Sequence, residues 1–424
     1  MLFQAGNSLT TGSFFNFFIY GFQPSALWLS LFMIIPETAQ ALGVFIHRQF
    51  SFSPRRKRTW LIALGISRTF AFLVPLALLF PAGAKGNFGA LAYLTICVTG
   101  WYVAQGVAYV NYLSWLSDLA PRRDWGHLFS WRQIGGLLIS VVVPLGTLQL
   151  RNRILSPLPD EAERWSYAVI FTLGGLLVLA SVLPLMSLPE RPAELPSKRH
   201  GICRAVDWDG IWQNRNFRWL LASRWTLAVF QGLTQAVLFK YAVGVLKVSL
   251  PTYLMLISLM LVLQLPLAWL AGKFSDREQD RGALFCGLLL VSLAMPCWLM
   301  ATPEHWQWLI PAYAFWGFFA LVNVCGTNSC LKLAPAQENR TCLALYEQGS
   351  GLLAGVAGLI GGLSLDQLLS ASASPTAAAL STGMTPYHLL ITLSWIGRVL
   401  AGVLALGVRI PAATEVGTTG NPSA

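Results

Sequence analysis

Charged residues are scarce in this sequence. They make up 11% of the 424 residues, whereas hydrophobic residues make up 55%. The mean hydropathy is +0.57, and the first charged side chain is that of Glu37. A soluble globular domain carries about 25% charged residues, so the composition excludes that class. The chain is predicted to be an integral membrane protein that has the lipid bilayer as its main surroundings.

Sequence patterns for bond-making chemistry are also missing. The seven cysteines form no Cys-x-x-Cys pair, and the five histidines are scattered without the spacing of metal ligands. The glycine-rich stretch 351–362 lacks the Lys-Ser/Thr that completes a phosphate-binding loop. We therefore expect no enzymatic activity, no metal and no cofactor, and any energy for work would come from a gradient across the membrane.

The net charge of +11 would also suit a nucleic-acid-binding protein. However, the Lys and Arg residues gather in short loops between apolar segments, mostly in the loops that follow even-numbered segments. Cytoplasmic loops of membrane proteins carry such an excess of basic residues. We therefore expect no nucleic-acid partner, a location in the plasma membrane, and both termini in the cytoplasm with the even-numbered loops.

Apolar windows long enough to cross a membrane follow one another along nearly the whole chain. About 30 Å of hydrocarbon takes about 20 helical residues at about 1.5 Å per residue. Because a backbone in lipid must satisfy its own hydrogen bonds, each window is expected to be a helix. The twelve predicted spans are 3–22, 24–46, 60–82, 88–116, 127–149, 166–187, 217–243, 249–271, 283–301, 307–332, 342–365 and 387–410.

The spans fall into two similar halves. Leu119-Ala-Pro121 after the fourth span reappears as Leu333-Ala-Pro335 after the tenth span, an offset of 214 residues (333 minus 119), and the same offset relates Gln133 to Glu347. A polar stretch rich in proline and charge separates the halves. The predicted organisation is an N-terminal six-helix half (1–187), a cytoplasmic linker (188–216), a C-terminal six-helix half (217–410) and a polar tail (411–424).

A loop motif supports this organisation. The loop after span eight reads Gly272-Lys-Phe-Ser-Asp276-Arg277, with Arg281 beyond it. Six spans, a charged linker and six more spans with this motif resemble the major facilitator superfamily over essentially the whole chain. The resemblance implies that the glycine permits close helix approach, while the carboxylate caps a neighbouring helix and pairs with arginine, which latches the cytoplasmic side.

The loop after span two holds a degenerate copy of the motif. Gly43 and Arg48 are present, but His47 stands where the family has aspartate. Arg132, which lies shallow in span five, is expected to belong to the same inner gate. The residues that the resemblance assigns to a cytoplasmic gate are Gly43, Arg48, Arg132, Gly272, Asp276, Arg277 and Arg281.

Two further stretches resemble family patterns. Trp115-Leu-Ser-Asp118-Leu-Ala-Pro121 is similar to a loop pattern of bacterial facilitator transporters. In span four the family often has Arg-x-x-Gln-Gly, which is associated with proton coupling; this chain keeps Gln105 and Gly106 but has Tyr102 in place of the arginine. Span five lacks the glycine signature of drug-extruding antiporters. The resemblance therefore favours a carrier that is not a proton-driven multidrug pump.

Polar and aromatic residues recur at helical spacing inside several spans. In span four, Tyr102, Gln105 and Tyr109 stand at i, i+3 and i+7, so they share one helix face. Uncharged polar groups with aromatic rings suit a neutral or zwitterionic organic solute, although such residues also bond between helices. The predicted cavity residues are Asn7, Thr11, Tyr102, Gln105, Tyr109, Gln231, Gln235, Tyr313, Trp316 and Asn323.

Ionisable residues at membrane depth need a partner or a task because ionised groups are costly in hydrocarbon. Glu37 is a candidate site for a proton or cation, or a carboxyl held neutral or paired with an arginine such as Arg68. Glu347 is a second coupling candidate, or else part of a gate or salt bridge. Arg224 and Lys240 lie near the ends of span seven and are expected to reach the membrane interface.

Together these patterns predict a secondary active transporter that moves a small organic solute by alternating access. We expect a monomer, with H⁺ or Na⁺ as the candidate coupling ion. The alternative is a transport-inactive sensor or scaffold with the same fold, indicated by the changed motif residues His47 and Tyr102.

Overall fold

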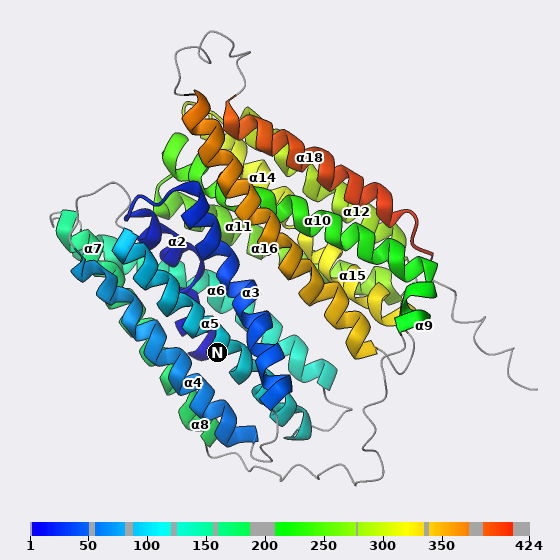
Figure 1. The fold of residues 1–424 in the computed structure, drawn as a ribbon, viewed down its shortest axis with the longest axis horizontal. Helices are drawn as coiled ribbons and strands as arrows, with labels where there is room; N and C mark the ends of the chain where they lie inside the picture. Colours follow the sequence, from blue (N-terminus) through cyan, green and yellow to red (C-terminus); the bar gives the residue numbers. More distant parts are fainter. Residues whose placement is uncertain are drawn as a thin grey trace, which may run out of the picture.

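The computed structural model describes residues 2–50, 56–80, 88–119, 125–155, 160–186, 208–276, 279–334, 339–372 and 385–409. In these ranges every regular element is a helix (Figure 1). Nine helices of the described residues are long and apolar enough to cross a membrane. The other predicted spans correspond to the short pair α1 (Leu2–Thr10) and α2 (Gly12–Tyr20), to α3 (Ala26–Phe50) and to α6 (Trp125–Leu155).

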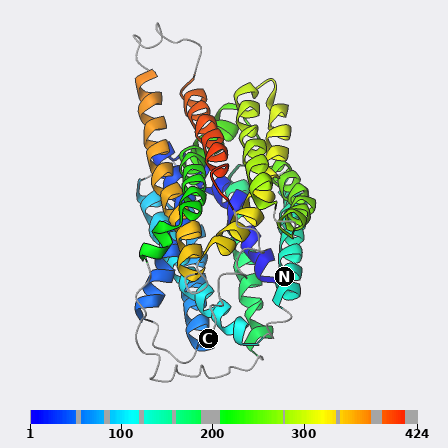
Figure 2. The ribbon, with the colours of Figure 1, turned by 90° about the vertical axis from the view of Figure 1, so that its right-hand side faces the viewer.

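The chain is therefore an all-α membrane protein with two six-helix halves, as predicted from the sequence. Figure 2 shows the spans running roughly along one axis of the molecule. Besides α1, α2, α3 and α6, the first half contains α4 (Arg56–Leu73), the 3₁₀ segment η1 (Val74–Leu79), α5 (Phe88–Leu119), α7 (Asp160–Ala180) and α8 (Val182–Met186).

The second half begins with α9 (Trp208–Gln213) and α10. Asn214 caps α10 by accepting from the backbone N–H groups of Asn216 and Phe217, both at 3.1 Å. The span therefore starts at Arg215, two residues before the predicted position. The further elements are α10 (Arg215–Lys240), η4 (Tyr241–Val245), α11 (Leu250–Asp276), α12 (Asp280–Ser292), α13 (Ala294–Met300), η5 (Trp306–Trp308), α14 (Leu309–Trp316), α15 (Phe319–Leu333), α16 (Asn339–Ser372) and α18 (Pro386–Ala405).

Prolines explain two of the interruptions within spans. A proline ring clashes with the carbonyl four residues earlier and removes a hydrogen bond. Helix α7 ends at Ala180, four residues before Pro184, and α12 ends at Ser292, four residues before Pro296. Each span continues as a shorter helix, α8 or α13. Such breaks are tolerated in membranes where neighbouring helices satisfy the freed backbone groups.

The first span is broken without a proline. Gly12 has a φ of +62°, a left-handed conformation that glycine adopts at little cost. Thr11 remains bonded to α1, because both its N–H and its hydroxyl donate to the carbonyl of Asn7, at 3.0 and 2.7 Å. The sequence predicted one continuous span over 3–22. The structure corrects this to two helices of nine residues each.

The two halves meet along several pairs of helices, of which two make most of the contacts. Helix α3 of the first half packs against α16 of the second, and α6 packs against α11. At one end of the bundle, which we call the Asp366 end, α3 begins and α16 approaches its last residue. The opposite end, which we call the Lys332 end, carries the start of α16 and the last turn of α15. In Figure 1 the α3 and α16 ribbons diverge toward this second end.

Within the second half, glycines bring two helix backbones together. A Cβ atom at Gly232 of α10 would collide with the backbone of Ala354 on α16, whose Cα would lie 2.7 Å away. Gly361 of α16 stands in the same relation to the backbone of Leu233. Small residues permit this approach, and the resulting van der Waals contact replaces the hydrophobic driving force that lipid does not supply.

We predict that Gly232→Ala destabilises the protein by about 1–3 kcal/mol, because the added methyl group must displace a backbone rather than a flexible side chain. The change would lower the midpoint of thermal unfolding, followed by tryptophan fluorescence in detergent. Gly65→Ala is the matched control, since a Cβ atom there has no neighbour within 4 Å. Equal unfolding midpoints for the two variants would show that the α10–α16 contact is not close.

Candidate functional site

A carboxylate joins the two halves at the Asp366 end. Asp366 of α16 accepts hydrogen bonds from the backbone N–H groups of Ala26 (2.8 Å) and Leu27 (2.9 Å), the first residues of α3. Lys240 of α10 lies 3.5 Å from the same carboxylate. A negative charge at a helix N-terminus is favourable because unpaired N–H groups and the helix dipole both point toward it. The first turn of α3 is therefore held by the other half of the molecule.

Below this cap, glycines of α16 face α3 directly. A Cβ atom at Gly355 would lie 2.7 Å from Cγ2 of Thr38, and one at Gly358 would lie 2.6 Å from Cδ1 of Ile34. Nearer the Asp366 end, Gly362 faces Ser30 in the same way. The contact between the halves thus extends about three turns along α3. Helix α3 contributes side chains to it, whereas α16 contributes glycines.

Aromatic residues of α2, α10 and α11 form a further contact between the halves. The ring of Phe17 on α2 lies 5.5 Å from Phe239 of α10 and 5.6 Å from Tyr253 of α11, both in edge-to-face geometry. Tyr20 lies 6.0 Å from Phe239. We call Phe17, Tyr20, Phe239 and Tyr253 the aromatic seam. Edge-to-face pairs contribute about 0.5–1.5 kcal/mol each beyond the buried area, so the seam adds to the closure at this end.

Several predicted cavity residues of the second half present polar groups on exposed helix faces. Gln231 and Gln235 are exposed on α10, and Arg224 shares their stripe at spacings of seven and eleven residues. Asn323 is exposed on α15. Exposed amides on membrane-spanning helices indicate a surface that faces water rather than lipid.

An ion pair connects this surface to α16. Arg224 lies 3.1 Å from Glu347, and Thr327 donates to the other carboxylate oxygen at 3.3 Å. The side chain of Glu347, a predicted coupling residue, is still 45% exposed. Arg224 was expected to extend to the interface, but it pairs with an acid instead. We call the combined surface the polar wall, which consists of Arg224, Gln231, Gln235, Asn323, Thr327 and Glu347.

Tyr313 and Trp316 lie away from the polar wall. Tyr313 is 3% exposed, and its ring lies 4.9 Å from Trp316 and 6.2 Å from Tyr253. The sequence placed both residues on one stripe with Asn323. The helix is interrupted between α14 and α15 at Gly317, however, so the helical spacing does not run from Tyr313 to Asn323. The two rings pack in the core of the second half.

In the first half, two of the predicted residues, Tyr102 and Gln105, lie beside a buried arginine. Arg68 of α4 is 1% exposed and donates from Nη2 to Oε1 of Gln105 at 2.7 Å. Tyr102 stacks on Trp101, with ring centroids 5.0 Å apart. Asn7 and Thr11 are partly exposed at the break between α1 and α2. The first half therefore combines one cation with neutral polar groups.

Some predicted residues lie outside the part of the structure that is described. Arg277 is not described at all. For the other residues the helix is described but the side chain or its surroundings are not: Glu37, Gly43, Arg48, Tyr109, Arg132 and Asp276. Of the described gate residues, Gly272 has open space where a Cβ would stand. Arg281 donates to the carbonyl of Leu406 after α18, so its partner belongs to the same half.

The sequence missed a buried ion pair beside the loop motif. Asp280 is fully buried and lies 2.6 Å from Nζ of Lys332, which also donates to the carbonyl of Ser275 at 3.0 Å. The pair joins α11, α12 and α15 at the Lys332 end. Asp280 lies between the predicted spans 249–271 and 283–301, and Lys332 is the last residue of the predicted span 307–332, so neither was among the predicted site residues. Asp366 was missed because the predicted span ended at residue 365.

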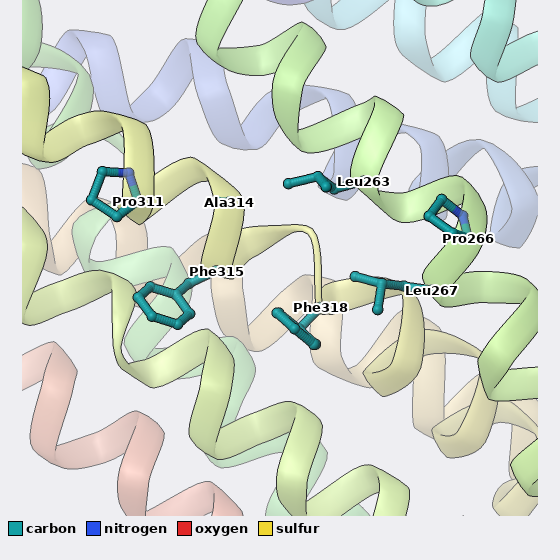
Figure 3. A pocket seen from close by; sticks show the side chains of 7 residues that line it. All are labelled: Leu263, Pro266, Leu267, Pro311, Ala314, Phe315 and Phe318. Carbon is teal, nitrogen blue, oxygen red and sulfur yellow. The ribbon is translucent and has the colours of Figure 1, made fainter.

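An apolar groove lies between α11 and α14 (Figure 3). Its volume is about 370 Å³, and its lining residues are Leu263, Pro266, Leu267, Pro311, Ala314, Phe315 and Phe318. None of these side chains can donate or accept a hydrogen bond, so the groove cannot orient a polar solute. The polar wall is therefore the better candidate for solute contact.

Known structures share this fold along nearly the whole chain. A D-xylose-proton symporter matches at 15% identity with a TM-score of 0.69, covering 95% of this chain and 94% of that one. The inward open xylose transporter XylE from E. coli matches at 14% identity with a TM-score of 0.62, over 95% and 92%. A bacterial homologue of the iron transporter ferroportin, in an inward-facing state, matches at 16% identity with a TM-score of 0.63, over 96% of each chain.

At these identities the structural neighbours establish the fold alone; they are transporters rather than enzymes. Among curated protein sequences, none matches the chain. The model of the family described as Major Facilitator Superfamily matches residues 1–359, which is well over half of the sequence. The chain therefore belongs to the major facilitator superfamily.

Proposed function

We propose that this protein carries a small organic solute across the plasma membrane by alternating access, and that the structure is its inward-facing state. The observation that carries the proposal is the closure between the halves, which consists of a carboxylate cap, a glycine-lined helix contact and the aromatic seam, all toward the Asp366 end. Family membership supports transport as the general function, and the solute and mechanism are our proposal.

The orientation follows from charge. The Lys332 end carries the loops after even-numbered spans, which hold most of the Lys and Arg residues. An excess of basic residues favours the cytoplasmic side. We therefore place this end and both termini in the cytoplasm, so that the Asp366 end faces outward. The polar wall would then be reached from the cytoplasm in this state.

The polar wall is the proposed solute surface, together with Tyr102, Gln105, Asn7 and Thr11 of the first half. Amide and hydroxyl groups on spanning helices can hydrogen-bond a solute that has given up its water. The energy would come from a gradient of H⁺ or Na⁺ or of the solute itself. Glu347 remains a coupling candidate because its side chain is partly exposed and its carboxylate is shared by Arg224 and Thr327. Glu37 also remains a coupling candidate, because it is an acid in the middle of a predicted span. We expect the monomer to be the transporting unit.

The transport proposal predicts saturable exchange in proteoliposomes containing the full chain, measured with labelled amino acids, sugars, nucleosides and organic acids. Replacing Gln231 and Asn323 together by leucine should lower kcat/KM about tenfold or more, because each lost hydrogen bond to a solute costs about 0.5–1.5 kcal/mol. Gln213→Leu, outside the membrane-spanning helices, is the control and should transport normally. Absence of saturable exchange for every solute class would contradict the proposal.

The cap at the Asp366 end predicts a change in amide exchange. Asp366→Asn keeps the shape of the side chain but removes its charge, which should speed hydrogen–deuterium exchange at Ala26 and Leu27 about tenfold, equivalent to about 1.4 kcal/mol. The peptide covering residues 24–30 reports both amides by mass spectrometry. Asp209→Asn, an exposed position on α9, is the matched control. Unchanged exchange in the Asp366 variant would mean that the cap does not hold α3.

A further inference from the structure

The first half buries a cation, Arg68, at membrane depth, and no acid of the described residues pairs with it. Arg68 lies near the middle of its span, and among the described residues its only hydrogen-bond partner is the neutral Gln105. Two of its nitrogens, Nε and Nη1, are buried and have no partner. An uncompensated charge inside a membrane protein costs several kcal/mol by most measures. Such a group needs a counter-charge from elsewhere during the working cycle.

The groups around Arg68 do not supply that counter-charge. The guanidinium carbon lies 5.8 Å from the ring of Phe3 and 5.9 Å from the ring of Trp101, which gives cation–π attraction but no negative charge. Ser67 donates to the same oxygen of Gln105 at 3.2 Å. The carbonyl oxygen of Gln105 therefore already accepts two hydrogen bonds, and only its amide nitrogen remains free to bond another group.

The polar groups that remain at this point are mainly donors. They are Nε and Nη1 of Arg68, the amide nitrogen of Gln105 and the hydroxyl of Tyr102. Gln105 and Tyr102 are both partly exposed, so solvent reaches part of each side chain. A cluster of donors around a guanidinium is complementary to an acceptor-rich anion, and carboxylate is the anion that guanidinium matches best among organic groups.

The other buried ions of the described chain lack this character. Lys332 has Asp280, and Arg224 has Glu347. Arg398 of α18 has no acid among the described residues and an unpartnered Nη1, but its other two nitrogens donate to the hydroxyls of Ser394 (3.1 Å) and Thr234 (3.4 Å). Both hydroxyl residues are fully buried, so the polar partners of Arg398 are not in contact with solvent. Among the described arginines, Arg68 combines unpartnered nitrogens and no acid partner with polar neighbours that are partly exposed.

We propose that Arg68, with Tyr102 and Gln105, binds a carboxylate group of the transported solute, so that the solute is an organic anion or a zwitterion. This inference rests on the proposed transport function and narrows it. The carboxylate replaces the missing counter-charge, and the polar wall of the second half contacts the remainder of the solute. In the present state Phe3 covers the guanidinium from α1, so entry requires a side chain to move.

The experiment measures binding to the purified full chain by the shift of its thermal unfolding midpoint. Benzoate, succinate and gluconate are each compared with the matched amide, and sodium chloride and sodium sulfate serve as inorganic anions at equal ionic strength. For the wild type we expect at least one carboxylate to bind about tenfold or more tightly than its amide, as one added charged hydrogen bond would give. No protection by any carboxylate, or equal protection by chloride or sulfate, would overturn the proposal.

Variants then assign the effect to the arginine. Arg68→Gln should weaken carboxylate binding about 10- to 100-fold while the affinity for the amide changes less than about threefold. Arg398→Gln is the matched control and should keep the discrimination. If Arg68→Gln does not fold, Arg68→Lys replaces it, and it should bind carboxylate about 3- to 10-fold more weakly than the wild type because the fork of donors is lost.

Two results would refute the role of Arg68. One is carboxylate binding by the Arg68 variant that equals the wild type, and the other is an equal loss for carboxylate and amide. Failure of this inference differs from failure of the transport proposal. Saturable exchange that does not depend on Arg68 would leave the transporter intact and remove the carboxylate site, whereas no exchange of any solute would remove the transporter itself.

Discussion

Hydrocarbon offers no hydrogen bonds, and this constraint decides where the polar groups of the chain lie. Most ionised groups within the described spans have found partners: Asp280 has Lys332, Arg224 has Glu347, and Asp366 has both Lys240 and two backbone amides. The exceptions then carry information. Exposed amides on α10 and α15 indicate a water-facing surface, and Arg68 indicates a counter-charge that the described protein does not provide.

The same constraint separates rigid contacts from reversible ones. Within the second half, α10 and α16 approach so closely at Gly232 that a single methyl group would meet the backbone of the partner helix. Between the halves, glycines of α16 also approach α3 closely, but the described hydrogen bonds there are those of Asp366 to the first amides of α3, and the bond to Leu27 is exposed. Water can replace such bonds at little cost when the helices separate. Stiff halves joined by replaceable bonds are the mechanical requirement for rocking about a central site.

Much of the fold could be predicted from the sequence, because span length and hydrophobicity are set by the thickness of the bilayer. The all-α architecture, the two halves and the family were confirmed. The break at Gly12 could not be predicted, since one glycine in an apolar run gives no local signal of a left-handed residue. The stripe from Tyr313 to Asn323 was wrong for a related reason, because helical spacing assumes an unbroken helix. Asp366 lay one residue beyond the predicted end of its span.

Side-chain partners were the least predictable feature. Arg68 was paired with Glu37 in one interpretation of the sequence, yet its described hydrogen-bond partner is Gln105, 37 residues away along the chain. Such contacts depend on how α4 and α5 pack, which the hydrophobic pattern does not fix. For the same reason the sequence predicted that Gln105 is a polar cavity residue but could not show that it bonds to the buried Arg68.

The central claim is that the two ends of the bundle close in alternation. Two pairs of spin labels test it most directly in lipid nanodiscs, on a chain with its native cysteines replaced: positions 23 and 370 at the Asp366 end, and positions 58 and 279 at the Lys332 end. The account predicts that the 23–370 distance lengthens only in the population in which the 58–279 distance shortens. Distances that stay fixed at both ends, or that change together in the same direction, would contradict it.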